Sequence, residues 1–135
     1  MFYMNKYSKL FNNSSGFTAI TDIENGKFIE VNDSFCRLTG FSREELIGYS
    51  SFELGILSEE IRNKLKEDIL NNNKIESIEK EIIDRSGEKH IVLISADLLT
   101  LNSDSYILTS GVDITQNKKA EEELRKSENN NENNN

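Results

Sequence analysis

The residue types that most often carry out chemistry are scarce in this sequence, which holds one histidine, His90, and one cysteine, Cys36. One residue of each type cannot supply the ligands of a His/Cys metal site, and a lone cysteine excludes an internal disulfide. No nucleophile motif accompanies His90, and there is neither a glycine-rich phosphate loop nor a nucleophile elbow. The sequence therefore predicts a chain that does not catalyse.

The remaining candidate groups have ordinary structural interpretations. The acidic clusters fall on predicted helix surfaces, where solvation explains them: Glu44-Glu45, Glu59-Glu60 and Glu121-Glu122-Glu123. We expect Cys36 to be a buried or half-buried small hydrophobe rather than a redox sensor, because its one basic neighbour is Arg37. His90 follows a polar turn, so we expect it to be exposed to solvent rather than to ligate anything.

Charge and hydropathy exclude several classes of partner. The net charge of -8 and a pI of about 4.7 would repel nucleic acid and anionic membrane. The longest aliphatic run, residues 91–94, is far shorter than the ~20 residues that cross a bilayer. The first residues lack the pattern of a signal peptide, so we expect a cytoplasmic protein with no membrane insertion.

The elements that position these residues can be outlined from periodicity and turn signals. Apolar residues at helical spacing predict an amphipathic helix at residues 1–13: Tyr3, Tyr7, Leu10 and Phe11. Asn25-Gly26 lies between strand-like runs at 17–23 and 27–31, which is a hairpin signal. Helices are expected to follow, with N-caps offered by Asn32-Asp33-Ser34, by Ser42 and by Ser58.

Two of these helices carry more detailed signals. Ser42 and Glu45 form a capping-box pattern. In the longer helix that Ser58 opens, Ile61, Leu65 and Ile69 form the expected buried stripe.

The last third of the chain has the period of two that is typical of strands. Strands are expected up to residue 84, at about 90–101 and at 106–112, with turns at Arg85-Ser86-Gly87 and Asn102-Ser103-Asp104. A charged exit helix is expected at 116–128, and the Asn-rich tail at 129–135 is expected to be disordered. Segregated helices on an antiparallel sheet predict an α+β fold.

Four segments together resemble the PAS family, over nearly the whole chain from about Leu10 to Leu124. They are Phe17-Thr18-Ala19-Ile20-Thr21-Asp22, Val31-Asn32-Asp33-Ser34-Phe35, the run from Leu38 to Gly48, and Gly111-Val112-Asp113-Ile114-Thr115. The resemblance implies a PAS sensory domain at 14–115. Its five-stranded antiparallel sheet would have the order 2-1-5-4-3, with helices packed over one face around a small-ligand cleft.

The sequence departs from cofactor-binding members of the family. Ser51 stands where light-sensing members carry a flavin-reactive cysteine, residues 58–70 hold no haem-ligating histidine, and the chain has no tryptophan. We therefore expect neither haem nor a thiol adduct with flavin, and the cofactor, if any, stays unidentified.

The resemblance also implies which side chains face the cleft. The candidate ligand-binding residues are Ala19, Thr21, Ser51, Leu65, Ile69, Ile78, Lys80, Ile82, Val92, Ile94, Thr109 and Gly111. Lys80 shares strand phase with Ile78 and Ile82, so its ammonium could pair with a ligand carboxylate or phosphate, or else reach the rim. Gly111 could leave room for a ligand or allow close packing against the sheet.

Asp113 and Thr115 are the candidate coupling residues. Asp113 and Gln116 give a second capping-box pattern, which predicts that Asp113 caps the exit helix. In family members this element connects the sheet to the output.

Two non-enzymatic functions remain open. One is a sensor that binds a small ligand and controls an effector, such as a histidine kinase or a diguanylate cyclase. The other is a ligand-free module used for dimerisation or docking. A homodimer is expected through Tyr3, Tyr7, Leu10 and Phe11 with the outer sheet residues Ile91, Leu93 and Leu99.

Overall fold

A computed structural model describes residues 16–133 of the 135-residue chain, with side chains as far as residue 128. The helix expected at 1–13, with Tyr3, Tyr7, Leu10 and Phe11, lies outside the described residues.

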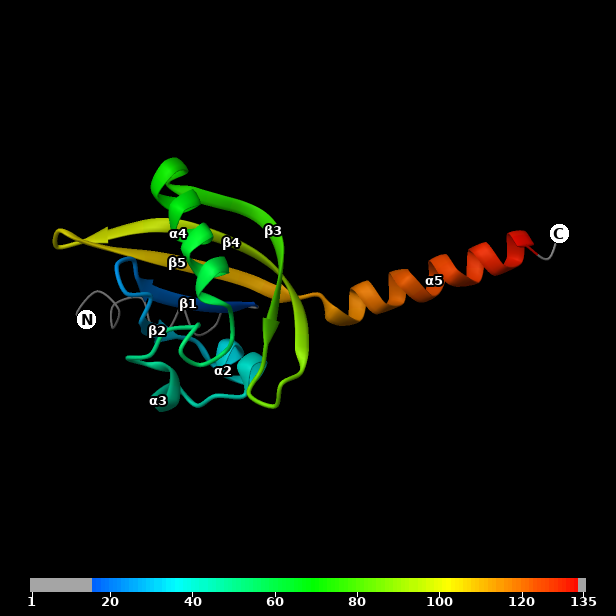
Figure 1. Ribbon diagram of the computed structural model, residues 1–135, viewed down its shortest axis with the longest axis horizontal. Helices are drawn as coiled ribbons and strands as arrows, with labels where there is room; N and C mark the ends of the chain where they lie inside the picture. Colours follow the sequence, from blue (N-terminus) through cyan, green and yellow to red (C-terminus); the bar gives the residue numbers. More distant parts are fainter. Residues whose placement is uncertain (1–15, 134–135) are drawn as a thin grey trace.

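The centre of the fold is one antiparallel sheet of five strands in the order β2-β1-β5-β4-β3 (Figure 1). The strands are β1 (Phe17–Asp22), β2 (Phe28–Val31), β3 (Lys74–Ile83), β4 (Lys89–Leu101) and β5 (Asp104–Asp113). The α+β class and the strand order expected from the family resemblance are confirmed. Because β1 pairs with β5, the hairpin at the start of the chain and the meander at its end form one surface.

Turn chemistry explains where the strands reverse. At the first hairpin Gly26 has a φ of +74° and donates its N–H to the carbonyl of Asp22. Asn25 keeps a negative φ, so only the glycine of the Asn-Gly pair takes the left-handed conformation. Between β4 and β5 the left-handed residues are Asn102 and Ser103, where a turn was predicted.

Side-chain caps begin the three helices of the middle segment, α2 (Asp33–Thr39), α3 (Arg43–Leu46) and α4 (Glu59–Asn72). Asn32 caps α2 and Ser58 caps α4. Ser42 and Glu45 make both bonds of a capping box at α3. These three predicted caps are confirmed.

These helices cover one face of the sheet and enclose the core between the two layers (Figure 1). Leu65 and Ile69 of α4 face the core as expected, but the assignment of Ile61 to the buried stripe is wrong. Ile61 is 37% exposed, whereas Arg62 is 7% exposed. Arg62, Leu65 and Ile69 share one face of α4, because they stand three and four residues apart.

Cys36 on α2 is half-buried and packs against the core. Its burial, with Asp33 nearby, raises the pKa of its thiol, so the inert interpretation fits its surroundings.

The exit helix α5 (Thr115–Asn133) leads away from the sheet beyond the end of β5 (Figure 1). It continues through Asn133, so the boundary expected at residue 128 is not seen. An asparagine in a helix costs up to about 0.7 kcal/mol relative to alanine, against about 3 kcal/mol for proline, so a run of asparagines does not by itself end a helix. Within residues 16–133 no helix combines the length and the apolar character that crossing a membrane requires.

Candidate ligand cavity and its link to the exit helix

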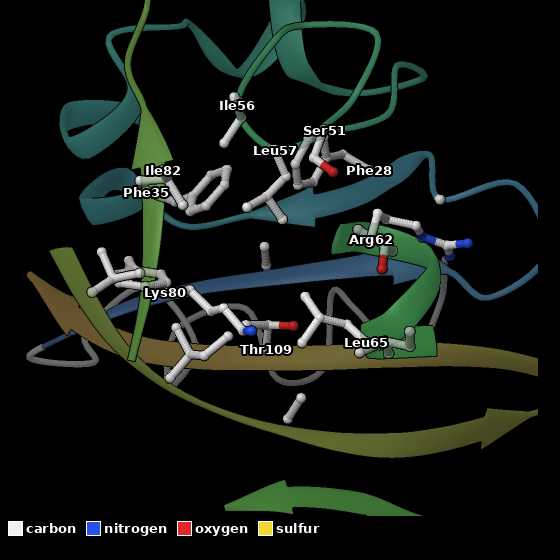
Figure 2. A pocket seen from close by; sticks show the side chains of 18 of the residues that line it. Phe28, Phe35, Ser51, Ile56, Leu57, Arg62, Leu65, Lys80, Ile82 and Thr109 are labelled. Atoms are coloured by element: carbon white, nitrogen blue, oxygen red, sulfur yellow. The ribbon is translucent and has the colours of Figure 1, made fainter. Parts of the chain in front are cut away.

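A cavity of about 100 Å³ lies between the helical layer and the inner face of the sheet (Figure 2). Strands β1, β3, β4 and β5 supply one wall, and α4 with residues from the preceding loop supplies much of the other. The lining is Phe17, Ala19, Thr21, Gly26, Phe28, Phe35, Ser51, Ile56, Leu57, Arg62, Leu65, Ile69, Ile75, Lys80, Ile82, Val92, Ile94, Ala96, Ile107 and Thr109.

Strand register explains why space remains on this face of the sheet. Ala19 on β1 pairs with Thr109 on β5, and Thr109 pairs with Ala96 on β4. Three small side chains therefore stand in one row across adjacent strands. Larger side chains surround this row, so its short side chains leave the gap unfilled.

Most of the candidate ligand-binding residues line this cavity, namely Ala19, Thr21, Ser51, Leu65, Ile69, Lys80, Ile82, Val92, Ile94 and Thr109. Contact with a ligand stays a prediction for all of them. Ile78 is not part of the lining and packs instead against both core clusters.

Gly111 does not line the cavity either. A Cβ atom at this position would lie 2.3 Å from the carbonyl oxygen of Leu93 and 2.8 Å from Cζ of Phe17. The missing side chain therefore permits close packing between strands and under the Phe17 ring, rather than leaving room beside a ligand.

Lys80 extends from β3 into the cavity towards Thr109 (Figure 2). It is partly buried, and among the described residues it makes neither an ion pair nor a side-chain hydrogen bond. The β-bulge between Ile75 and Ile78 precedes it, so the inward phase of Ile78, Lys80 and Ile82 is kept.

Arg62 also lines the cavity, although the sequence did not single it out. Its guanidinium donates to the carbonyl oxygens of Asp22, at 3.1 Å, and Ile23, at 2.9 Å, which ties α4 to the first hairpin. Burial lowers the pKa of Arg62. The spacing of Arg62, Leu65 and Ile69 on α4 is the sequence signal that could have revealed it.

The size of the cavity limits what it holds in this conformation. An apolar cavity of about 150 Å³ takes up benzene, and this cavity is smaller, at about 100 Å³. A flavin or haem ring system does not fit without rearrangement. Ser51 lines the wall at the position where the family resemblance places the flavin-reactive thiol.

Beside the cavity, Asp113 and Thr115 connect the sheet to α5. Asp113 Oδ1 accepts from the backbone N–H of Thr115, at 2.9 Å, and from its hydroxyl, at 2.5 Å. Thr115 Oγ1 in turn accepts from the N–H of Ile91, at 2.9 Å. The predicted capping box is corrected here, because Asp113 binds Thr115, two residues on, and the structure gives no side-chain bond to Gln116 among its described residues.

His90 extends this connection, and its predicted solvent exposure is wrong. Its Nδ1 lies 3.0 Å from Asp113 Oδ2, and its Nε2 lies 2.8 Å from Asp84 Oδ2. Its side chain is only 18% exposed. The imidazole thus joins the turn after β3 to the end of β5.

Two carboxylate partners require both nitrogens of His90 to carry protons, because a carboxylate only accepts. Accordingly, the hydrogen bond to Asp84, with a further one to Asp113, raises the pKa of His90. The same bond holds the pKa of Asp84 well below its usual range. For Asp113, burial opposes ionisation, but the bonds from Thr115 and His90 outweigh it and lower the pKa.

Asp84, Glu88 and His90 also have ligand atoms within 4.8 Å of one another. Both ring nitrogens of His90 already bind carboxylates, so the geometry is that of a charged hydrogen-bond network.

A family model described as a PAS domain matches residues 15–116 of the chain. The chain belongs to the PAS domain family. PAS domains are generally non-catalytic sensory modules.

Solved PAS structures share this fold at low sequence identity. A PAS domain of a two-component sensor histidine kinase aligns with a TM-score of 0.69 at 20% identity, covering 83% of this chain and 96% of the other. A PAS domain from Colwellia psychrerythraea gives 0.71 at 20% identity, with 84% and 98% covered. A Rhodobacter sphaeroides LOV protein gives 0.68 at 16% identity, with 84% and 68% covered. No curated protein matches the chain.

Proposed function

We propose that this PAS domain binds a small ligand in its cavity and transmits the binding event through α5 to an effector, such as a histidine kinase or a diguanylate cyclase. The cavity is the observation that carries the proposal. Its volume of about 100 Å³ is several times the ~10–15 Å³ of the same measure that one water molecule needs. The side chains of the domain do not fill it.

The path from cavity to exit helix is short and specific, which supports the second half of the proposal. Thr109 lines the cavity, and Asp113 lies further along the same strand, β5. A ligand that displaces β5 would alter the bonds of Asp113 to His90 and Thr115. Coupling between sites typically amounts to about 1–3 kcal/mol, which is within reach of such bonds. The effector follows from a likeness to a PAS domain of a sensor histidine kinase.

The alternative is a ligand-free PAS domain used for dimerisation or docking. The outward-facing Val112, 44% exposed, and Leu124, 61% exposed, favour an interaction surface. The two functions differ in whether the cavity must stay open.

A cavity-filling variant tests the proposal. Ala19 is 3% exposed and lines the cavity, so Ala19→Leu should occupy the space that a ligand needs. Native mass spectrometry of the wild-type protein should detect a co-purifying small molecule that Ala19→Leu loses. Ala120→Leu, on the exposed surface of α5, is the matched control. A folded Ala19→Leu protein with unchanged ligand content would contradict the proposal, and so would a wild-type protein that carries no small molecule and binds none from a metabolite mixture.

A further inference from the structure

The side chains that line the cavity carry unbalanced charges, although Asp22 and Glu24 just outside the lining partly compensate Arg62. The lining includes two cationic side chains, Arg62 and Lys80, and among the described residues it includes no aspartate or glutamate. A site of this kind favours anions, because low-dielectric walls strengthen the field of an uncompensated positive charge.

The two cations differ in their existing partners. The guanidinium of Arg62 already donates to the carbonyl oxygens of Asp22 and Ile23, so it serves the fold. Lys80 has no hydrogen bond or ion pair among the described residues, and its side chain points into the cavity (Figure 2). A partly buried ammonium without an acceptor is costly, and a ligand anion would remove that cost.

The rest of the lining limits the type of anion. Most of it is aliphatic or aromatic, and the hydroxyls come from Thr21, Ser51 and Thr109. A phosphate dianion is held best by several charged donors, such as an arginine fork, whereas a single ammonium can neutralise one carboxylate. The apolar walls then require an apolar remainder of the ligand.

Cavity size limits that remainder. The cavity of about 100 Å³ is two thirds of the size of a benzene site, which corresponds to an apolar group of roughly four carbons.

From these observations we infer that the ligand class is a small monocarboxylate with a short aliphatic or compact apolar group, its carboxylate paired with Lys80. This inference rests on the proposed function, because it specifies the ligand of the same cavity. Thr109 is placed to donate a second hydrogen bond to the carboxylate, since Lys80 extends towards it (Figure 2).

The test compares isosteric probes and two lysine variants. Pentanoate and its neutral amide, pentanamide, are titrated into the full chain while chemical shifts of the cavity residues are followed by NMR. Lys80→Met keeps an unbranched side chain, one heavy atom shorter, and removes its charge. Lys89→Met is the control, because Lys89 is exposed and does not line the cavity.

Pentanoate should bind the wild-type protein at least tenfold more tightly than pentanamide, since a hydrogen bond to a charged group is worth about a factor of ten or more. Lys80→Met should abolish this preference, and Lys89→Met should keep it. Removing an unpaired ammonium should also leave Lys80→Met at least as thermally stable as the wild type, so loss of binding would not reflect unfolding.

Equal binding of acid and amide, or an unchanged preference in Lys80→Met, would overturn the inference of a carboxylate. The proposed function would still stand in that case if Ala19→Leu blocked both probes. If neither probe shifted the cavity residues at millimolar concentration, the carboxylate class would be wrong. The co-purification experiment would then decide separately whether the cavity binds anything at all.

Discussion

His90 fixes the start of α5 through a charged bridge. The imidazole lies between the carboxylates of Asp84 and Asp113, and Asp113 in turn binds Thr115. These three side chains, Asp84, His90 and Asp113, connect the sheet to the first residue of α5. The bond of His90 to Asp84, at 2.8 Å, has the length of a charge-assisted hydrogen bond, and the bond to Asp113, at 3.0 Å, is slightly longer. Charge-assisted bonds are stronger than neutral ones.

This bridge predicts a pH-dependent stability. The folded-state pKa of His90 is raised above its unfolded value of about 6.5, so its contribution is fully present below that value. The contribution is lost as the pH rises through the higher folded-state pKa. Urea unfolding of wild type and His90→Gln between pH 5.5 and 9 should give a free-energy difference that shrinks as the pH rises. Glu88 belongs to the same cluster but is not one of the two carboxylates bonded to His90, so Glu88→Gln is the control and should leave that trend in place. A difference independent of pH would contradict a protonated bridge.

The sequence could predict Lys80 in the cavity but could not predict the bridge. Side chains in a strand alternate strictly, so the phase shared by Ile78, Lys80 and Ile82 follows from local spacing. The partners of His90 stand 6 and 23 residues away in the sequence. The β3–β4 hairpin brings Asp84 to the imidazole, and the register of β4 with β5 brings Asp113 to it. The polar residues before His90 therefore suggested exposure instead.

At the scale of elements, Arg62 is the link between α4 and the first hairpin. Its donors satisfy carbonyl oxygens of Asp22 and Ile23. A Cβ atom on Gly26 would lie 2.9 Å from Arg62 Nε, so the hairpin passes directly beneath the guanidinium. Hydrophobicity favoured the apolar Ile61 for the core, although the helical spacing fits Arg62 as well, and in the structure the arginine takes the buried place.

Arg62→Met should therefore destabilise the domain by about 1–3 kcal/mol, because it leaves backbone acceptors without their donor. Lys64→Met is the control on the same helix. Lys64 is exposed and pairs with Asp68 at i,i+4, an interaction worth about 0.3–0.5 kcal/mol. Chemical denaturation of both variants measures the difference. Equal effects of the two variants would show that the Arg62 bonds add nothing to the stability of the fold.

The second link between elements is Asp113. Removing its carboxylate in Asp113→Ala should loosen the start of α5, because Thr115 loses both of its bonds to Asp113 and His90 loses one partner. Amide hydrogen exchange should accelerate in the first turn of α5 while β1 stays protected. Asp104→Ala, at the exposed opposite end of β5, is the control and should leave α5 unchanged. Exchange that rises throughout the domain would make Asp113 a general stability residue, and unchanged exchange in α5 would remove its coupling role.

At the scale of the whole molecule, no helix within residues 16–133 covers the outer face of the sheet or packs along α5. Figure 1 shows α2, α3 and α4 on the other face and α5 leading away from the domain. Ile91 and Leu93 of β4 are partly exposed, on the face opposite to Val92 and Ile94. Helices in proteins are stabilised mainly by packing against other elements, and α5 extends away from the sheet of its own chain. Packing against a second copy of the chain would supply this stabilisation.

We therefore expect a homodimer that buries the outer face around Val112, which is 44% exposed, with the two α5 helices leaving side by side. Light scattering at tens of micromolar should give the mass of a dimer. Val112→Glu should weaken the dimer at least tenfold, because a carboxylate buried in the interface would lack a partner. Leu70→Glu is the matched control, since Leu70 is 54% exposed but lies on α4, in the opposite layer. A monomeric wild type, or a Val112→Glu protein that stays as dimeric as Leu70→Glu, would exclude this face as the interface.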